Sequence, residues 1–243
     1  MKSLIISDNI AMLSAARKMA SQARWSRVEW ACSVKAEAEC RAWAKRDEVR
    51  VVDVKREASR LAAEYGLILS LHCRQIFPPK LVRTTRCVNL HPGYNPYNRG
   101  WFPHVWGMMR GDPIGVTLHV MDGRVDHGAV IHRERVKVRL VETSDQVYQR
   151  LLNAELKVLR QWWPWLQIGK YRTERVGEGT FRTKKDFEHA KRLPLERRMT
   201  LGRALDYMKA MTFEGRRNAY VIDPQTRKKV YVTLKFESED SIK

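Results

Sequence analysis

The sequence predicts an α/β protein in which a mainly parallel sheet is flanked by helices. Short apolar runs alternate with helix-like segments from the start of the chain, which is the pattern of β-α-β units. The run at residues 67–71 is apolar throughout, as expected of a strand covered on both faces. Hydrophobic residues make up 44% of the 243 residues, a share typical of a globular protein.

Four strands and three helices are predicted before residue 72. Asp8 or Asn9 follows the first apolar run and is a suitable N-cap for a helix that reaches Gln22. Gly66 is suited to end the third helix, because glycine readily adopts the left-handed conformation found there. The predicted strands are residues 3–7, 28–33, 49–54 and 67–71, and the predicted helices are 9–22, 35–46 and 55–65.

The next part of the chain continues the sheet and adds a long helix. We expect strands at 87–91, 115–121 and 129–138, and a short helix at 101–110 that Gly111 ends. Thr143 precedes a long helix that ends near Pro164. The core-facing stripe of this helix comprises Tyr148, Leu152, Leu156 and Leu159.

From about residue 170 the sequence becomes charged and contains glycine, so we place a domain boundary there. Residues 1–169 form the predicted core and residues 170–243 a small C-terminal extension. The extension is predicted to contain a helix at 195–211 and a β-hairpin from strands at 219–224 and 229–234. Because a hairpin is marginal alone, we expect it to pack on the core or on a second copy, which favours a homodimer.

The cysteines and the N-terminus favour a cytoplasmic protein. Cys32, Cys40, Cys73 and Cys87 show no C-x-x-C pairing and lie in or beside apolar runs, as reduced buried thiols do. The N-terminal apolar run is too short for a signal peptide or a membrane span. We therefore expect no membrane association.

The most informative motif is Asn89-x-His91 followed by Pro92-Gly93. Successive strand residues face opposite sides, so Asn89 and His91 emerge on one side where an apolar strand ends. Asp126, in the run Asp126-His127-Gly128, adds a carboxylate. An amide, an imidazole and a carboxylate at the carboxyl edge of a sheet are suited to acyl transfer onto an amine. The alternative is that such residues only support a turn.

The loop after this motif, residues 94–103, is rich in aromatic and turn-forming residues, and loops of this content usually bind a ligand. Taken with the motif, it resembles the N10-formyltetrahydrofolate-dependent formyltransferases, whose signature is Asn-x-His and a distant Asp-x-Gly. Within that family, residues 91–103 are similar to the sugar N-formyltransferases that act on nucleotide-linked 4-amino-4,6-dideoxyhexoses. The resemblance continues at 113–119, 125–131, 184–187 and 217–223, and it includes a short opening at residues 4–9.

This resemblance implies a Rossmann-like core and transfer of a formyl group from N10-formyltetrahydrofolate to a sugar 4-amino group. The favoured acceptor is dTDP-4-amino-4,6-dideoxyglucose, with GDP-perosamine as the other, for O-antigen or other glycan synthesis. Asn89 and His91 would donate to the oxyanion, each contribution being about 3 kcal/mol. Asp126 would orient His91 and relay protons.

The family also implies positions for both substrates. The pterin of the folate would lie against the backbone of residues 73–78 and the turn at 122–123, at Arg74, Gln75, Ile76, Asp122 and Gly123. The nucleotide sugar would meet Tyr94, Tyr97, Asn98, Arg99, Trp101 and Lys184, with Arg99 at a pyrophosphate. Residues 179–183 depart from the relatives' sequence, and residues 20–48 show little of it, so contacts there are unassigned.

The net charge of +19, from 46 Lys and Arg against 27 Asp and Glu, leaves three interpretations open. Nucleic acid binding is one, but no known nucleic-acid motif is evident. A basic cleft for a nucleotide diphosphate and a folate carboxylate is the second, and a solvated basic surface is the third. Because the basic residues are spread along the chain, we favour the last two together and expect no nucleic acid partner.

Two further hypotheses concern the chemistry. The residues His119, Asp122, Asp126 and His127 lie close in sequence, but their spacing fits no common zinc pattern, so we expect no metal. Formylation of methionyl-tRNA or of glycinamide ribonucleotide would use the same catalytic groups. The first normally needs a larger C-terminal barrel, and the second lacks the aromatic loop.

Overall fold

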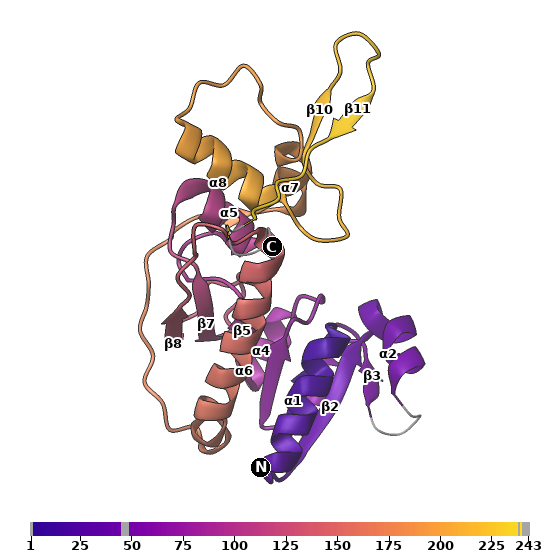
Figure 1. The fold of residues 1–243 in the computed structure, drawn as a ribbon. Helices are drawn as coiled ribbons and strands as arrows, with labels where there is room; N and C mark the ends of the chain where they lie inside the picture. Colours follow the sequence, from indigo (N-terminus) through magenta and orange to yellow (C-terminus); the bar gives the residue numbers. More distant parts are fainter. Residues whose placement is uncertain (1, 45–48, 238, 240–243) are drawn as a thin grey trace.

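The computed structural model describes residues 2–44, 49–237 and 239. Its centre is a seven-stranded sheet with the order β3-β2-β1-β4-β5-β7-β8 (Figure 1). Strands β3, β2, β1, β4 and β5 are parallel to one another. The sheet continues with β7, which is antiparallel to β5, and with β8, which is antiparallel to β7. The mainly parallel α/β sheet is thus confirmed. Its strands are β1 (Ser3–Ile6), β2 (Val28–Ser33), β3 (Arg50–Val52), β4 (Leu67–Leu71), β5 (Arg86–His91), β7 (Gly115–Val120) and β8 (Val130–Arg135).

Helices cover both faces of this sheet. Leu69 of β4 belongs to an apolar cluster with α1, α5 and α6, whereas its neighbour Ile68 belongs to a second cluster with α3 and α4. Successive strand residues face opposite sides, so a fully apolar strand is covered twice. The helices are α1 (Ile10–Gln22), α2 (Glu37–Trp43), α3 (Ala58–Glu64), α4 (Pro79–Thr84), α5 (Pro103–Arg110), α6 (Ser144–Ile168), α7 (Lys184–Ala190) and α8 (Leu201–Met211).

Several predicted helix boundaries are wrong. α6 continues past Pro164 to Ile168, because the buried side chains of Trp163 and Leu166 hold its last turn, and Gly169 closes it with a φ of 71°. α2 is preceded by a short 3-10 turn, η1 (Val34–Ala36). The last two residues of the helix predicted at 35–46 lie outside the described residues.

The C-terminal extension contains helices that the sequence pattern placed only in part. α8 begins at Leu201 rather than residue 195, because the Thr200 side chain caps it. α7 was not predicted, although Thr183 and Asp186 form a capping box at its start.

One helix of the core was also not predicted. This helix is α4, which begins at Pro79.

The predicted hairpin is confirmed as β10 (Tyr220–Ile222) and β11 (Lys229–Tyr231), and it projects from one end of the molecule (Figure 1). A second small sheet joins β6 (Arg99–Gly100) to β9 (Phe181–Arg182). All four cysteines are unpaired, and three are buried, whereas Cys73 is partly exposed. No helix within the described ranges is long and apolar enough to cross a membrane.

Candidate active site

The three side chains predicted to be catalytic meet at one edge of the sheet. Asn89 and His91 lie on β5, and Asp126 lies in the turn between β7 and β8. The Nδ2 atom of Asn89 donates to Asp126 Oδ1 over 2.9 Å, and His91 Nδ1 lies 3.6 Å from Asp126 Oδ2. This is the carboxyl end of β5, where open α/β sheets bind ligands.

The backbone around Asp126 fixes its carboxylate. Asp126 has a φ of 50°, a left-handed conformation, and the side chain of Asn95 donates to its carbonyl oxygen over 2.8 Å. The Gly100 N–H donates to Asp126 Oδ2 over 3.1 Å. Gly128 allows the turn, because a Cβ there would lie only 1.7 Å from the carbonyl oxygen of Val120. The glycine of the Asp-x-Gly pattern is therefore required by close packing.

The charges of Asp126 and His91 are set by opposing effects. Burial pushes the pKa of Asp126 upward, but His91, His119 and the Gly100 N–H outweigh it and hold that pKa at about 2. Burial lowers the pKa of His91, and Asp126 offsets this only in part. An anionic carboxylate thus lies 3.6 Å from Nδ1 of an imidazole whose neutral form burial favours, and this neighbour favours the tautomer with the proton on Nδ1 and the lone pair on Nε2.

The Nε2 atom of His91 is buried close to Gly93. Within the described part of the chain, the buried Nε2 atom has no hydrogen-bond partner. A Cβ added at Gly93 would lie 2.3 Å from Nε2. His91 therefore keeps an unpartnered nitrogen at a position where close packing requires glycine at residue 93.

His119 is a fourth member of the cluster that the sequence analysis did not assign to it. The antiparallel register of β5 and β7 pairs Asn89 with His119, and His119 Nε2 lies 3.2 Å from Asn89 Nδ2. His119 Nδ1 lies 2.9 Å from the carbonyl oxygen of Val120, so it is the protonated nitrogen and Nε2 accepts. In the sequence, His119 stands out as a histidine inside an apolar strand. Its neighbour Asn89 could not be predicted, because it is set by the pairing of β5 with β7.

Part of the extension lies against this site. Glu174 and Val130 of β8 exchange two backbone hydrogen bonds of 2.8 Å, and further along the segment Phe181 and Arg182 pair with β6. Thr180 Oγ1 accepts from the backbone N–H of Asn98 over 2.7 Å, and Glu178 pairs with Arg124 over 2.7 Å. This segment therefore bridges the loop after β5 and the turn that carries Asp126.

The predicted sugar-binding residues divide into exposed and buried groups. Tyr97 and Trp101 are exposed, and the Lys184 ammonium lies 5.8 Å from the centre of the Trp101 ring. Asn98 and Arg99 are buried, and most of their polar side-chain atoms are engaged within the protein, although Arg99 Nε has no hydrogen-bond partner among the described residues. The Asn98 amide donates to Asp112 over 3.0 Å, and the Arg99 guanidinium donates to the carbonyl oxygen of Glu178.

Tyr94, the remaining predicted aromatic, is partly buried beneath the guanidinium of Arg133, which lies 5.2 Å from the ring centre. Arg133 also donates to the carbonyl oxygen of Asn95 over 3.0 Å. Tyr94 therefore supports the loop after β5. The groups of this loop that face outward are Tyr97 and Trp101.

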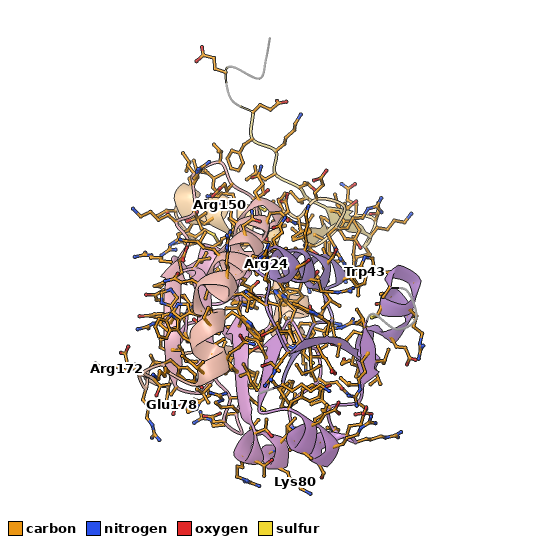
Figure 2. All side chains as sticks on the ribbon, turned by 90° about the horizontal axis from the view of Figure 1, so that it is seen from below. Arg24, Trp43, Lys80, Arg150, Arg172 and Glu178 are labelled. Atoms are coloured by element: carbon orange, nitrogen blue, oxygen red, sulfur yellow. The ribbon has the colours of Figure 1, made fainter. Side chains whose placement is uncertain are left out.

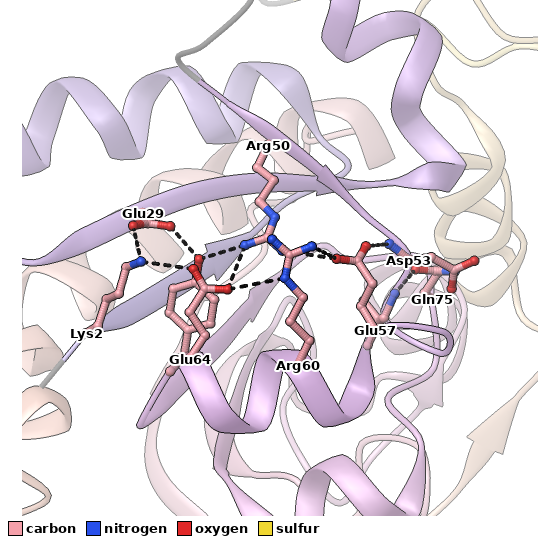
Figure 3. Close-up of polar contacts among 10 residues, drawn as sticks. Lys2, Glu29, Arg50, Asp53, Glu57, Arg60, Glu64 and Gln75 are labelled. Atoms are coloured by element: carbon pink, nitrogen blue, oxygen red, sulfur yellow. Dashed lines mark hydrogen bonds and ion pairs between the residues drawn. The ribbon is translucent and has the colours of Figure 1, made fainter.

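The predicted folate segment is fixed by its own side chains. Gln75 Oε1 accepts from the Val54 N–H over 2.8 Å, and Gln75 Nε2 donates to Asp53 over 3.2 Å. Asp53 belongs to a chain of polar contacts that passes through Glu57 and Arg50 (Figure 3). These contacts tie residues 73–78 to the end of β3.

Arg74 is held in a similar way, because its N–H donates to Asp8 over 2.6 Å. Ile76, in contrast, is 65% exposed. In the turn, Asp122 pairs with His127 over 2.7 Å, and a Cβ at Gly123 would have no described atom within 4 Å. Open surface is therefore available at Ile76 and at Gly123.

The residues named in the metal hypothesis lie in or next to the same turn. Asp122 pairs with His127, whereas His119 and Asp126 belong to the catalytic cluster. Among the residues that the structure describes, no group of three or more His, Cys, Asp or Glu side chains could hold a metal ion.

The fold and site are those of an α/β protein that binds ligands at the carboxyl edge of its sheet. Residues 3–162 match the model of the Formyl transferase family, and residues 186–238 match the N-formyltransferase dimerization C-terminal domain. This chain belongs to the formyl transferase family.

Known relatives resemble it along most of its length. A dTDP-4-amino-4,6-dideoxyglucose formyltransferase of Mycobacterium tuberculosis is 39% identical over 188 residues, 77% of this chain and 80% of the relative. A 4-N formyltransferase structure from Francisella tularensis has a TM-score of 0.90 and 33% identity, covering 98% of both chains. A formyltransferase from Anoxybacillus kamchatkensis, solved with UDP-4,6-dideoxy-4-formamido-L-AltNAc and tetrahydrofolate, has a TM-score of 0.61 and 25% identity over 78% of this chain and 89% of that one.

Proposed function

We propose that this protein transfers a formyl group from N10-formyltetrahydrofolate to the 4-amino group of a nucleotide-linked 4-amino-4,6-dideoxyhexose. The observation that carries the proposal is the meeting of Asn89, His91 and Asp126, with the Nε2 lone pair of His91 free. The relatives support the substrate class, since one is a dTDP-4-amino-4,6-dideoxyglucose formyltransferase. We take dTDP-4-amino-4,6-dideoxyglucose as the favoured acceptor and GDP-perosamine as the other.

The reaction forms a bond between the sugar nitrogen and the formyl carbon and breaks the bond from that carbon to N10 of the folate. His91 Nε2 accepts a proton from the attacking amine, and the imidazolium that results is stabilised by Asp126. Protonated Nε2 can then donate to the oxyanion and return the proton to the leaving N10 nitrogen. One proton therefore moves from the acceptor amine to tetrahydrofolate, and no redox change occurs.

In the free protein, the side-chain amide of Asn89 is already hydrogen-bonded, whereas its predicted role requires it to donate to the oxyanion. Its Nδ2 atom is engaged by Asp126 and lies near Nε2 of His119. Donation to an oxyanion thus requires that one of these partners be exchanged when substrate binds. We propose that Asn89 orients Asp126 in the free enzyme and donates to the oxyanion in the complex.

The two substrates would approach along the exposed groups of the site. Ile76 and Gly123 offer surface for the folate, and Tyr97, Trp101 and Lys184 offer aromatic and basic groups for the nucleotide sugar. The product would serve the synthesis of O-antigen or another surface glycan. The four unpaired thiols favour a reducing compartment, so we place the reaction in the cytoplasm.

We further propose that the protein acts as a homodimer. Its extension matches a dimerization domain, and the β11 residues Val230 and Tyr231 are exposed on the projecting hairpin. Exposed apolar residues on a two-stranded hairpin favour packing against a second copy.

Nucleic acid binding is the alternative from another class, and it rests on the net charge of +19. Basic side chains such as Lys80, Arg150 and Arg172 project from separate parts of the surface (Figure 2). This dispersed arrangement favours a solvated basic surface over a single nucleic-acid groove.

The direct experiment incubates the protein with N10-formyltetrahydrofolate and a panel of nucleotide-linked amino sugars, followed by mass spectrometry. We expect one acceptor, dTDP-4-amino-4,6-dideoxyglucose, to gain the mass of a single carbonyl group. The panel includes GDP-perosamine, glycinamide ribonucleotide and methionyl-tRNA. Formylation of either of the last two, with none of a sugar, would refute the proposal.

A further inference from the structure

A carboxylate of the C-terminal extension lies among three basic side chains. The Oε2 atom of Glu178 lies 2.7 Å from Arg124 Nη2 and 3.9 Å from Arg99 Nη2. Its other oxygen, Oε1, lies 3.6 Å from His127 Nε2 and 3.3 Å from Arg124 Nη1. Arg99, Arg124 and His127 therefore form a basic cluster that one carboxylate of the protein itself occupies.

The basic cluster adjoins the catalytic carboxylate through the backbone. Arg124 and His127 come before and after Asp126 in the turn between β7 and β8. Arg99 precedes Gly100, whose N–H donates to Asp126 Oδ2 over 3.1 Å. A ligand anchored at the basic cluster is therefore held next to the active site.

The cluster has a hydrogen-bond donor that Glu178 does not use. The Arg99 side chain is buried, and its Nε atom has no hydrogen-bond partner among the described residues. A buried donor without a partner is unfavourable, and it indicates a place for a further acceptor. Guanidinium groups bind phosphate oxygens with two parallel N–H donors, which suits them to polyvalent anions.

The backbone of Glu178 is fixed, whereas its side chain can turn away. The Arg99 guanidinium donates to the Glu178 carbonyl oxygen, and a Cβ at Gly179 would lie 1.9 Å from the carbonyl oxygen of Pro96. The Glu178 side chain is 73% exposed, at the edge of the molecule (Figure 2). Exposed ion pairs contribute little stability, because water solvates the separated charges. The Glu178 carboxylate can therefore leave the basic cluster at low cost.

Two other acidic residues lie in the same turn, and both have partners of their own. Asp126 belongs to the catalytic cluster, where its carboxylate accepts from Asn89. Asp122 Oδ2 lies 2.7 Å from His127 Nδ1, and its Oδ1 accepts from the Arg124 N–H over 2.8 Å. Asp122 thus holds the His127 ring on the side opposite Nε2. Neither carboxylate takes the place that Glu178 occupies.

We propose that Arg99, Arg124 and His127 bind the diphosphate of the nucleotide sugar, and that Glu178 occupies this site until the substrate displaces it. The inference rests on the proposed function for the identity of the anion. A diphosphate carries more negative charge than a carboxylate and has more acceptor oxygens, so it matches three basic groups better than Glu178 does. The Glu178 side chain is thus an internal competitor that weakens the binding of diphosphates.

The test measures binding of inorganic pyrophosphate and of dTDP to the full-length protein by isothermal titration calorimetry. Glu178→Gln removes the competing charge and keeps the side-chain volume, so both ligands should bind about 2- to 5-fold more tightly than to the wild type. Arg124→Gln removes a cation of the site from an exposed position and should weaken both about 10-fold. Unchanged dissociation constants in these two variants, or no binding of either ligand, would overturn the proposal.

Glu174→Gln is the matched control, because it makes the same change of charge on the same segment. Glu174 is 70% exposed and pairs with Arg133 over 3.6 Å, so its replacement should leave both dissociation constants unchanged. Equal tightening in both glutamine variants would show a general charge effect and refute a specific site.

A second probe separates the diphosphate from the carboxylates of the folate. N-(4-aminobenzoyl)glutamate carries those carboxylates without a diphosphate, and its binding should not respond to Glu178→Gln. Tighter binding of this probe, with no change for pyrophosphate, would assign the site to the folate and contradict the proposal. Pyrophosphate binding requires no formyl transfer, so failure of the formylation assay would refute the proposed function and leave this measurement standing.

Discussion

Asp126 is a largely buried carboxylate, 11% exposed, and its polar contacts all favour its ionised form. Its Oδ1 atom accepts from Asn89, its Oδ2 atom accepts from Gly100, and His91 lies 3.6 Å away. We expect Asp126→Asn to lower kcat about 100-fold or more, because a neutral amide cannot stabilise the imidazolium that forms at His91. Steady-state formylation assays, with circular dichroism to check folding, measure this. The matched control is Asp206→Asn on α8, and a variant of Asp126 that turns over like this control would contradict the assignment.

The ionisation of Asp126 also predicts how stability depends on pH. Its pKa is about 2 in the folded protein, against 3.8 for the ordinary group. A depressed folded pKa contributes stability that is present above the unfolded pKa and is lost as pH falls through the folded value. The contribution is about 2.5 kcal/mol, because each whole number by which the two pKa values differ is worth about 1.4 kcal/mol. Urea unfolding between about pH 5 and pH 2 should show this loss in the wild type, and equal slopes in wild type and Asp126→Asn would contradict it.

Gly93 gives a third prediction at the residue scale. A Cβ at this position would lie 2.3 Å from His91 Nε2, so Gly93→Ala displaces the imidazole ring. We expect a fall in kcat of about 10-fold or more, since misplacement of a catalytic group by about 1 Å is costly. Gly202→Ala on α8, where no described atom lies within 4 Å of the added carbon, should leave kcat unchanged. Equal kcat values for the two variants would show that Gly93 is not needed.

At the scale of elements, the segment at residues 174–182 joins the extension to the active site. Thr180 Oγ1 accepts from the Asn98 N–H and donates to the Asn98 side chain over 3.3 Å. Thr180→Val should therefore destabilise the protein by about 1–3 kcal/mol, because it leaves buried polar groups of Asn98 without partners. We also expect kcat/KM to fall several-fold, as the loop after β5 loses a support. Differential scanning calorimetry and steady-state kinetics measure the two effects.

The control for this variant is Thr226→Val, which removes a hydrogen bond to Asp223 in the exposed hairpin turn. It should change stability little, since exposed groups regain water. If Thr180→Val changed stability and kcat/KM as little as this control, the segment at residues 174–182 would not support the active site.

Local sequence predicts where the strands of the sheet end, but it does not predict how they pair. Strands β4 and β5 follow from apolar runs bounded by turn residues, and their ends place Asn89 and His91 at the carboxyl edge. Asp126 was found from its Asp-x-Gly pattern. His119 was missed as a member of the site, because its neighbour Asn89 is brought to it by strand register, which no single strand specifies. The extension of α6 past Pro164 was missed because tertiary burial outweighs a local helix breaker.

The predicted substrate residues show a similar limit. Asn98 and Arg99 belong to a loop whose composition is typical of ligand binding, yet their side chains are buried by residues about 80 positions away. Contacts at this sequence separation depend on the whole fold, so composition could not separate the buried from the exposed members of the loop. The exposed Tyr97 and Trp101 remain predictions for sugar contacts.

At the scale of the whole molecule, the projecting hairpin predicts an assembly. Val230 is exposed on β11 and pairs across the hairpin with Val221. We expect Val230→Asp to dissociate a dimer, because a charge would then be buried at an apolar contact. Light scattering after size-exclusion chromatography measures the mass. The control is Lys229→Asp, which makes a larger charge change at the adjacent position and should retain the dimer. If both variants remained dimeric, the interface would lie elsewhere.

We propose that the cluster of Asn89, His91 and Asp126 transfers a formyl group to a nucleotide-linked amino sugar. The most direct measurement follows a carbon-13 formyl group from N10-formyltetrahydrofolate to dTDP-4-amino-4,6-dideoxyglucose by NMR, with wild type and His91→Gln in parallel. We predict a formamide signal on the sugar in the wild type and a signal reduced by orders of magnitude in the variant. A formamide that forms equally fast with His91→Gln, or no labelled sugar from a folded wild-type protein that binds both substrates, would contradict the account.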